Sequence, residues 1–162
     1  MEFEIDVSGE DISSKNYTIC VANKDNLIGG FKFNEKILSI LSSRFGQEFY
    51  KYKKSRKGKS AFKIRLYCLV IYYIFKNLRI KGEISLRLCR DFTGKDQEIK
   101  ENLKFFLEQK LGLDLKDRIF FDKLSPESNA HKYACLMRMD TKDKMNTYIN
   151  ITQEEFEKWL IR

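Results

Sequence analysis

The sequence predicts a mixed α/β fold: a single domain over residues 1–162, with helices on both faces of a five-stranded mixed sheet. The length of 162 residues suits one core, because domains usually hold about 100–200 residues. Three segments with strand patterns precede the first helical pattern, which favours an antiparallel three-strand meander. Strand and helix patterns then alternate, which is typical of β-α-β units with parallel strands.

The meander is predicted from three segments at the start of the chain. Residues 2–7 alternate apolar and polar side chains, and residues 17–22 are rich in β-branched and aromatic types. Turn-forming residues at 24–26 then lead into a third strand over 27–33, which predicts a hairpin. The adjacent glycines at 29 and 30 indicate either a bulge or a close approach by a neighbouring element.

Two helices are predicted after the meander. Asn34 is a suitable N-cap for a helix over residues 35–44. A longer helix is expected to begin at Ser60 or Ala61 and to end at Leu78, and its apolar residues cover nearly all faces, which indicates burial against the sheet. Its most apolar part, residues 66–75, is shorter than the roughly 20 residues that a membrane span needs, so no membrane partner is expected.

The second half of the chain supplies the β-α-β units and two closing helices. Right-handed crossovers would place the fourth strand beside the first. The expected segments are a strand over 83–92, a helix over 94–111 stopped by Gly112, a strand over 118–122, a helix opened by Ser125 with Pro126 in its first turn and continuing to Asp140, and a helix over 152–160 that begins with a capping box.

One basic segment, residues 51–65, accounts for the net charge of +8, because it holds eight cations and no acid. Aromatic residues are interleaved with these cations, and this combination suits contact with phosphates and bases. An exposed, solvated loop is the alternative interpretation. The candidate nucleic-acid-binding residues are Lys51, Lys53, Lys54, Arg56, Lys57 and Lys59.

Two carboxylates are expected to meet at one edge of the sheet. Asp6 lies inside the first strand and Asp91 at the end of the fourth, and these strands are predicted neighbours. Carboxylates that converge repel each other unless a cation lies between them, and Mg²⁺ is usually held by one or two carboxylates and water. Two such ions about 3.5–4 Å apart would activate a water and stabilise the leaving oxygen of a phosphodiester.

The element order and these two acids resemble the ribonuclease H-like superfamily. Residues 129–140 are similar to the C-terminal motif of type 2 ribonucleases H, and residues 5–10 are similar to the opening motif of that family. Val7 stands where that family has Glu, and His131 stands where it has its last Asp, as in some Holliday-junction resolvases. The whole chain also resembles a small archaeal family with no assigned function. The resemblance implies that the catalytic and metal-binding residues are Asp6, Asp91, Glu10 and His131.

Each of these residues also has an ordinary structural explanation. Asp6 could cap the turn that follows the first strand, and Asp91 could be a plain strand-end residue. Glu10 and Asp11 could be solvated loop acids, and a lone His such as His131 is often a surface helix residue. A buried, unpaired Asp is costly, which favours a role for Asp6.

Other chemistries have less support in the sequence. Glu35 and Glu48 are alternative sources of a helix-borne carboxylate. The segment Gly58–Ser60 ends like a P-loop, but Lys53 stands where the first Gly of that motif is required. A serine triad around His131 would lack a nucleophile elbow. Four scattered cysteines form no C-x-x-C pair, so we expect buried free thiols and no zinc site.

The sequence therefore predicts a divalent-metal-dependent nuclease that uses Mg²⁺ or Mn²⁺ on RNA, RNA/DNA hybrid or structured DNA. Two alternatives stay open: a non-catalytic nucleic-acid-binding module on the same fold, and a protein-interaction domain with an acidic partner. The first residues carry acids where a secretory signal carries basic residues, so a cytoplasmic location is expected. The sequence pattern leaves the oligomeric state open.

Overall fold

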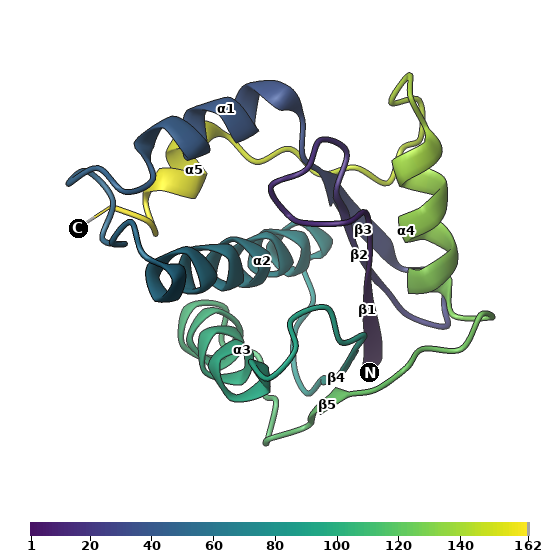
Figure 1. The fold of residues 1–162 in the computed structure, drawn as a ribbon. Coiled ribbons are helices and arrows are strands. Elements are labelled where there is room, and N and C mark those ends of the chain that lie inside the picture. Colours follow the sequence, from purple (N-terminus) through teal and green to yellow (C-terminus); the bar gives the residue numbers. More distant parts are fainter. Residues whose placement is uncertain (162) are drawn as a thin grey trace.

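The computed structural model describes residues 1–161 and contains a five-stranded mixed sheet (Figure 1). The strands lie in the order β3-β2-β1-β4-β5; β2 is antiparallel to β1 and β3, and β4 is parallel to β1 and β5. The predicted meander and the predicted pairing of the fourth strand with the first are both confirmed. The strands are β1 (Glu2–Ser8), β2 (Thr18–Ala22), β3 (Ile28–Lys32), β4 (Ser85–Leu88) and β5 (Ile119–Phe121).

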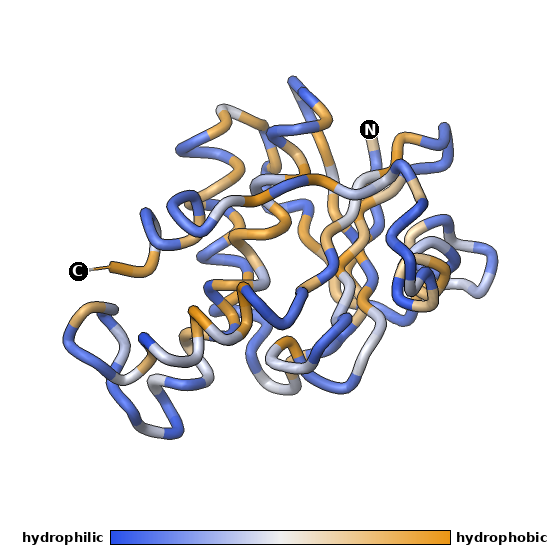
Figure 2. Tube along the Cα trace, turned by 90° about the horizontal axis from the view of Figure 1, so that it is seen from above, coloured by the Kyte–Doolittle hydropathy of each residue, from blue (hydrophilic) through white to orange (hydrophobic). Residues whose placement is uncertain are grey.

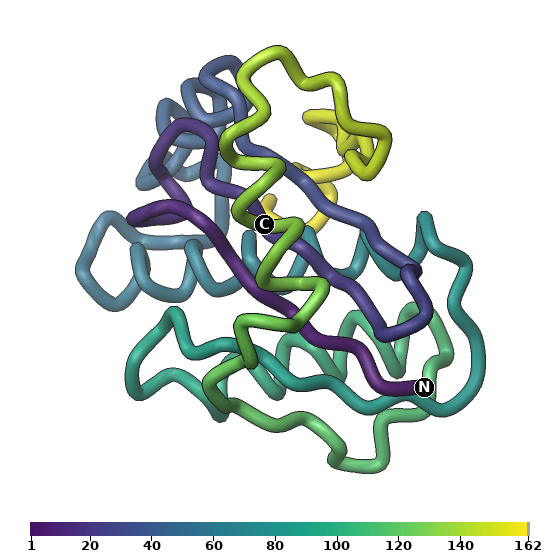
Figure 3. The backbone as a smooth tube through the Cα atoms, turned by 90° about the vertical axis from the view of Figure 1, so that its right-hand side faces the viewer, coloured from purple at the N-terminus to yellow at the C-terminus, as the bar shows by residue number. Residues whose placement is uncertain are grey.

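Helices cover both faces of the sheet, as predicted. Helix α4 crosses one face and contacts β1, β2 and β3, whereas α2 contacts β2 and β3 from the other face. Figure 3 shows α4 in green, running obliquely in front of the strands. The helical segments are α1 (Glu35–Arg44), α2 (Arg56–Leu78), α3 (Asp96–Leu103), the π-helical turn η1 (Lys104–Lys110), α4 (Asn129–Met139) and α5 (Gln153–Glu157).

Helix α2 forms the centre of the core. Every residue from Leu66 to Phe75 is buried, because the sheet covers one side of the helix and α3 and η1 cover another. Figure 2 shows the resulting separation, with hydrophobic stretches gathered in the interior and hydrophilic ones in the outer loops. Among residues 1–161, no helix is both long enough and apolar enough to cross a bilayer.

Helix α4 lies close to the sheet because small residues line the contact. A Cβ atom added at Gly30 would lie 2.7 Å from the sulfur of Met137, so the close approach predicted at this glycine is confirmed. Ala130 and Ala134 of the same helix are buried in a cluster with Cys20 of β2. This packing fixes the height of α4 above β1 and β2.

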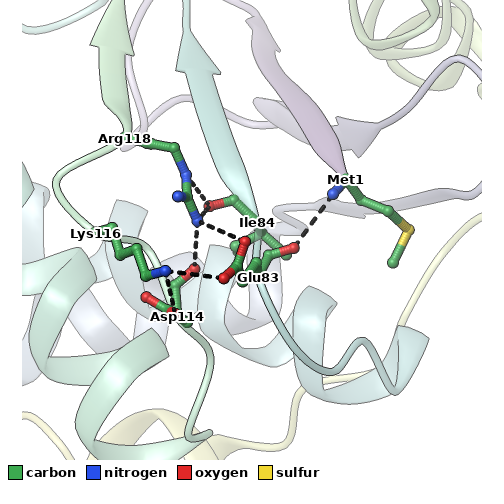
Figure 4. A network of polar contacts seen from close by, with 6 residues as sticks. All are labelled: Met1, Glu83, Ile84, Asp114, Lys116 and Arg118. Atoms are coloured by element: carbon green, nitrogen blue, oxygen red, sulfur yellow. Dashed lines mark hydrogen bonds and ion pairs between the residues drawn. The ribbon is translucent and has the colours of Figure 1, made fainter.

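A polar network joins the starts of β1, β4 and β5 (Figure 4). The Arg118 guanidinium donates hydrogen bonds to the carbonyl oxygens of Ile84 (3.3 Å) and Asp114 (3.1 Å). The amino group of Met1 donates to the carbonyl oxygen of Glu83 at 3.2 Å. The three parallel strands are therefore aligned at this edge, and their carboxyl ends meet at the opposite edge.

Two predicted boundaries in the middle of the chain are wrong. Helix α2 begins at Arg56 and not at Ser60 or Ala61, because Ser55 is its N-cap and accepts the Gly58 N–H at 3.0 Å. Two thirds of the basic segment, residues 56–65, is therefore helical. The fourth strand ends at Leu88 and not at residue 92, so the chain leaves the sheet before it reaches the second candidate carboxylate.

Two boundaries in the second half also differ. The helix opened by the expected Ser-Pro cap begins instead at Asn129, because Ser128 is the N-cap and Ser125 accepts the backbone N–H of Glu127 in a preceding turn. The single helix predicted over 94–111 is α3 followed by η1. The N-caps predicted at Asn34 and Thr152 are both confirmed.

All four cysteines are free thiols, as predicted. Their burial differs from the prediction, because only Cys20 and Cys68 are buried, Cys89 is half-buried and Cys135 is exposed. Cys135 lies on the outer face of α4, and α4 is covered by the sheet on its other face alone.

We expect Gly30→Ala to destabilise the protein by about 1–3 kcal/mol, because the new methyl group would overpack against the buried Met137 side chain. Urea unfolding of the variant measures the change. The double variant Gly30→Ala/Met137→Ala is the control, since truncation of Met137 removes the clash. Strictly additive losses in this cycle would contradict the contact.

Candidate functional site

Asp6 lies in the central strand β1 and faces α4. Its side chain is only 7% exposed, and its Oδ1 accepts the backbone N–H of Val7 at 2.8 Å. Its Oδ2 lies 2.8 Å from Nδ1 of His131, which is 53% exposed. The structure therefore brings together two of the residues that the sequence selected, although 125 positions separate them.

His131 reaches Asp6 because α4 begins just before it. The Ser128 side chain caps the helix and accepts the backbone N–H of His131 at 3.4 Å. The first turn of α4 thus holds the imidazole above β1. The same cap engages the Ser128 hydroxyl, which leaves no structural support for a serine triad at this position.

Asp91 lies three residues after the end of β4, and its side chain is hydrogen-bonded on the α2 side of the sheet. The fully buried Tyr17, which precedes β2, donates its hydroxyl hydrogen to Oδ2 of Asp91. Loss of hydration raises the pKa of Asp91 above its usual value, and the negative charges of Asp11 and Asp6 raise this pKa further. The Tyr17 hydrogen bond acts in the opposite direction by stabilising the carboxylate.

Asp6 lies in β1 and Asp91 follows β4, so both residues lie near the carboxyl ends of these neighbouring parallel strands. The backbone N–H of Cys89 donates to the carbonyl oxygen of Ile5 at 3.0 Å, which places Cys89 next to Asp6. Burial raises the pKa of the Cys89 thiol to about 11, and the negative charges of Asp6 and Asp91 contribute to this increase. Asp6 approaches this edge from the α4 side, and Asp91 approaches from the α2 side.

Asp11 is a third acid at this edge, and sequence reasoning had treated it as an ordinary loop residue. It lines a cavity of about 520 Å³ together with Asp91 and Glu10. Burial tends to raise the pKa of Asp11, but hydrogen bonds from Lys63 (2.8 Å) and Ser13 lower it to about 2. The available signal in the sequence was its position next to Glu10, at the end of the first strand.

The wall of this cavity opposite the acids is basic. Arg56, Lys59 and Lys63 line it, and their i, i+3, i+7 spacing places them on one face of α2. Lys54 lines an adjoining cavity of about 530 Å³, which shares Arg56 and Lys59 with the first. The remaining predicted nucleic-acid-binding residues, Lys51, Lys53 and Lys57, line neither cavity.

The two alternative helix-borne carboxylates lie elsewhere. Glu35 forms an exposed ion pair with Lys15 at 3.3 Å, and Glu48 is exposed in the segment between α1 and α2. Neither residue lines the cavity that holds Asp91 and Asp11. The acids of the site therefore come from strand ends and the loop after β1.

The donor set at this edge suits a hard divalent cation. Carboxylate oxygens are the protein ligands that Mg²⁺ prefers, and Mg²⁺ retains water at its other positions. Asp91 carries a negative charge that its neighbours disfavour, and an added cation would relieve this repulsion. Among the described residues, no group of three or more His, Cys, Asp and Glu side chains is arranged to hold one ion, so a bound ion would depend on two carboxylates and water.

Comparison with known proteins found no family model and no curated protein that matches this chain. Inference about function therefore starts from the geometry of the strand edge. That geometry combines a buried Asp-His pair, a second carboxylate with a raised pKa and a basic helix face beside the second carboxylate.

We expect Tyr17→Phe to raise the pKa of Asp91 further, because the variant loses the hydrogen bond that stabilises the ionised form. Asp6→Asn should shift the pKa of Asp91 in the opposite direction, because removal of a nearby negative charge lowers this pKa. Carboxyl-carbon NMR titration of Asp91 measures both shifts. Shifts of the same sign in the two variants would contradict the arrangement of these three residues.

Proposed function

We propose that the protein is a divalent-metal-dependent nuclease with a ribonuclease H-like fold. The strand order β3-β2-β1-β4-β5, with β1 antiparallel to β2 and parallel to β4, supports the fold proposal. The observation that carries the functional proposal is the position of Asp6 and Asp91 at the ends of neighbouring parallel strands, where the charge of Asp6 helps to raise the pKa of Asp91 and a basic helix face borders Asp91. Acids that repel each other next to phosphate-binding cations suit metal-assisted cleavage of a phosphodiester.

In this proposal Asp6 and Asp91 would hold Mg²⁺ or Mn²⁺, and water would complete the coordination, because among the described residues neither Glu10 nor His131 is arranged with both acids to hold one ion. A bound ion would lower the pKa of a water molecule and stabilise the charge on a leaving oxygen. His131 orients the Asp6 carboxylate through the 2.8 Å contact at Nδ1, and Tyr17 orients Asp91. Arg56 and Lys59 would hold phosphates near the acids.

A non-catalytic nucleic-acid-binding module is the second candidate, and one observation favours it. Both oxygens of Asp6 already have partners, one in the backbone N–H of Val7 and one in the His131 imidazole. This pair ties α4 to β1, which is a structural role that needs no metal. Such a module would bind nucleic acid in a salt-sensitive and metal-independent way and would cleave nothing.

We expect Asp6→Asn to reduce Mn²⁺-dependent cleavage by at least about 100-fold. Loss of a residue that only orients a metal ligand already reduces activity by about 10–100-fold, and loss of the ligand itself should reduce activity at least as much. Asn keeps the shape of Asp and can still contact His131, so the fold should persist. The measurement is gel-based cleavage of labelled RNA, RNA/DNA hybrid and four-way DNA junction with Mn²⁺ or Mg²⁺.

Asp25→Asn is the matched control, because Asp25 is an exposed acid in the turn between β2 and β3, away from the strand edge. This variant should cleave like the original protein. Cleavage that survives Asp6→Asn would refute the nuclease assignment. Binding without cleavage by the original protein, with every substrate and either metal, would establish the second candidate.

A further inference from the structure

We propose that an unpaired nucleic-acid strand reaches Asp91 along a groove beside the first turns of α2, bordered by the loop after β1 and the end of α1. This inference rests on the proposed nuclease function, because the strand would be bound in order to be cleaved. It adds the path of the substrate to the acids and its single-stranded character. The groove consists of the two adjoining cavities, of about 520 and 530 Å³. We call it the α2 groove, and its cations are Lys54, Arg56, Lys59 and Lys63.

The two cavities of the groove are neighbours and differ in their chemistry. Arg56 and Lys59 line both cavities, so a strand that spans the two cavities would pass these two cations. One end holds Asp91 and the other acids of the strand edge. The other end is lined by Ser42 and Phe45, at the end of α1. A bound strand would thus have one phosphate near the acids and further phosphates along α2.

Three of the four cations of the groove have no anionic partner among residues 1–161. Lys54, Arg56 and Lys59 form no ion pair within residues 1–161, whereas Lys63 is paired with Asp11. Arg56 and Lys59 also lie in the first turn of α2, which contains no acid to offset the positive end of the helix dipole. Several like charges held in one concave surface attract polyanions and concentrate them there.

Aromatic rings at both ends of the groove favour an unpaired strand over a duplex. Phe45 is partly exposed and stacks on Phe62, with ring centroids 4.9 Å apart. Phe92 is partly exposed at the acidic end and packs on Tyr67 at 5.2 Å. Each ring is supported from behind and has accessible surface. Unpaired bases can stack on such rings, whereas the faces of bases inside a duplex are already covered.

The decisive test compares two double variants that remove the same charge from the same segment. Arg56→Gln/Lys59→Gln alters the groove, and Lys53→Gln/Lys57→Gln alters cations that line neither cavity. Fluorescence anisotropy measures binding of labelled oligo(dT), oligo(U) and a mixed-sequence duplex across a range of salt concentrations, with EDTA present. Thermal unfolding of each variant checks that the fold is retained.

We expect the groove variant to bind single strands at least about 10-fold more weakly, and its salt slope to fall by about 1.4, since each single-strand phosphate contributes about 0.7. The control variant should keep most of its affinity and slope. Oligo(dT) and oligo(U) should bind more tightly than the duplex, and the ratio of the two identifies DNA or RNA. Phe45→Leu should weaken single-strand binding selectively, because it removes the ring and keeps an apolar side chain.

Equal losses in the two double variants would overturn the groove as the binding path. Tighter binding to duplex than to single strands would overturn the unpaired strand as the occupant. These outcomes are separate from the nuclease proposal, because they are measured without metal. Cleavage that survives Asp6→Asn, together with weak binding by Arg56→Gln/Lys59→Gln, would refute the nuclease and support the groove.

Discussion

The buried charge of Asp6 constrains the arrangement around it. A carboxylate in the middle of a central strand is costly unless hydrogen bonds compensate for lost hydration. The backbone N–H of Val7 supplies one partner, and His131 supplies another only because α4 lies close above the sheet. Gly30 permits that approach, since any side chain there would meet Met137. A small residue in β3 thus determines what Asp6 can contact in β1.

The parallel pairing of β1 with β4 determines where the second acid, Asp91, lies relative to Asp6. The pairing brings residue 89 beside Asp6, so the chain leaves the sheet with Asp91 within the electrostatic reach of two other carboxylates. Tyr17 stabilises Asp91 by a hydrogen bond, and Lys63 compensates Asp11 by an ion pair. Both partners come from segments on the α2 side of the sheet. Even so, the pKa of Asp91 stays raised beside a basic helix face, and a divalent ion at Asp91 would stabilise its charge.

Local signals predicted much of the fold, and long-range contacts decided the rest. The five strands and the caps at Asn34 and Thr152 depend on neighbours in sequence, so pattern and spacing were sufficient. The start of α2 was missed because Ser55 precedes a Gly within a run of cations, although the cap geometry is ordinary. The role of Asp11 depends on Lys63, which is 52 positions away. Which cations of the basic segment line the cavities depends on which face of α2 borders them. Neither relation leaves a pattern in the sequence.

The position of the cations in α2 is itself informative, because it opposes the stability of the helix. Positive side chains in a first turn interact unfavourably with the helix dipole, at a cost of roughly 0.3–1 kcal/mol each at low ionic strength. Helix α2 has three such residues, Arg56, Lys57 and Lys59, and no acid in that turn. Burial of residues 66–75 secures the helix further along and can offset this cost. A phosphate bound at the groove would be attracted both by Arg56 and Lys59 and by the positive end of the helix dipole, and this attraction would offset the cost, whereas a solvated helix end would gain nothing from cations at these positions.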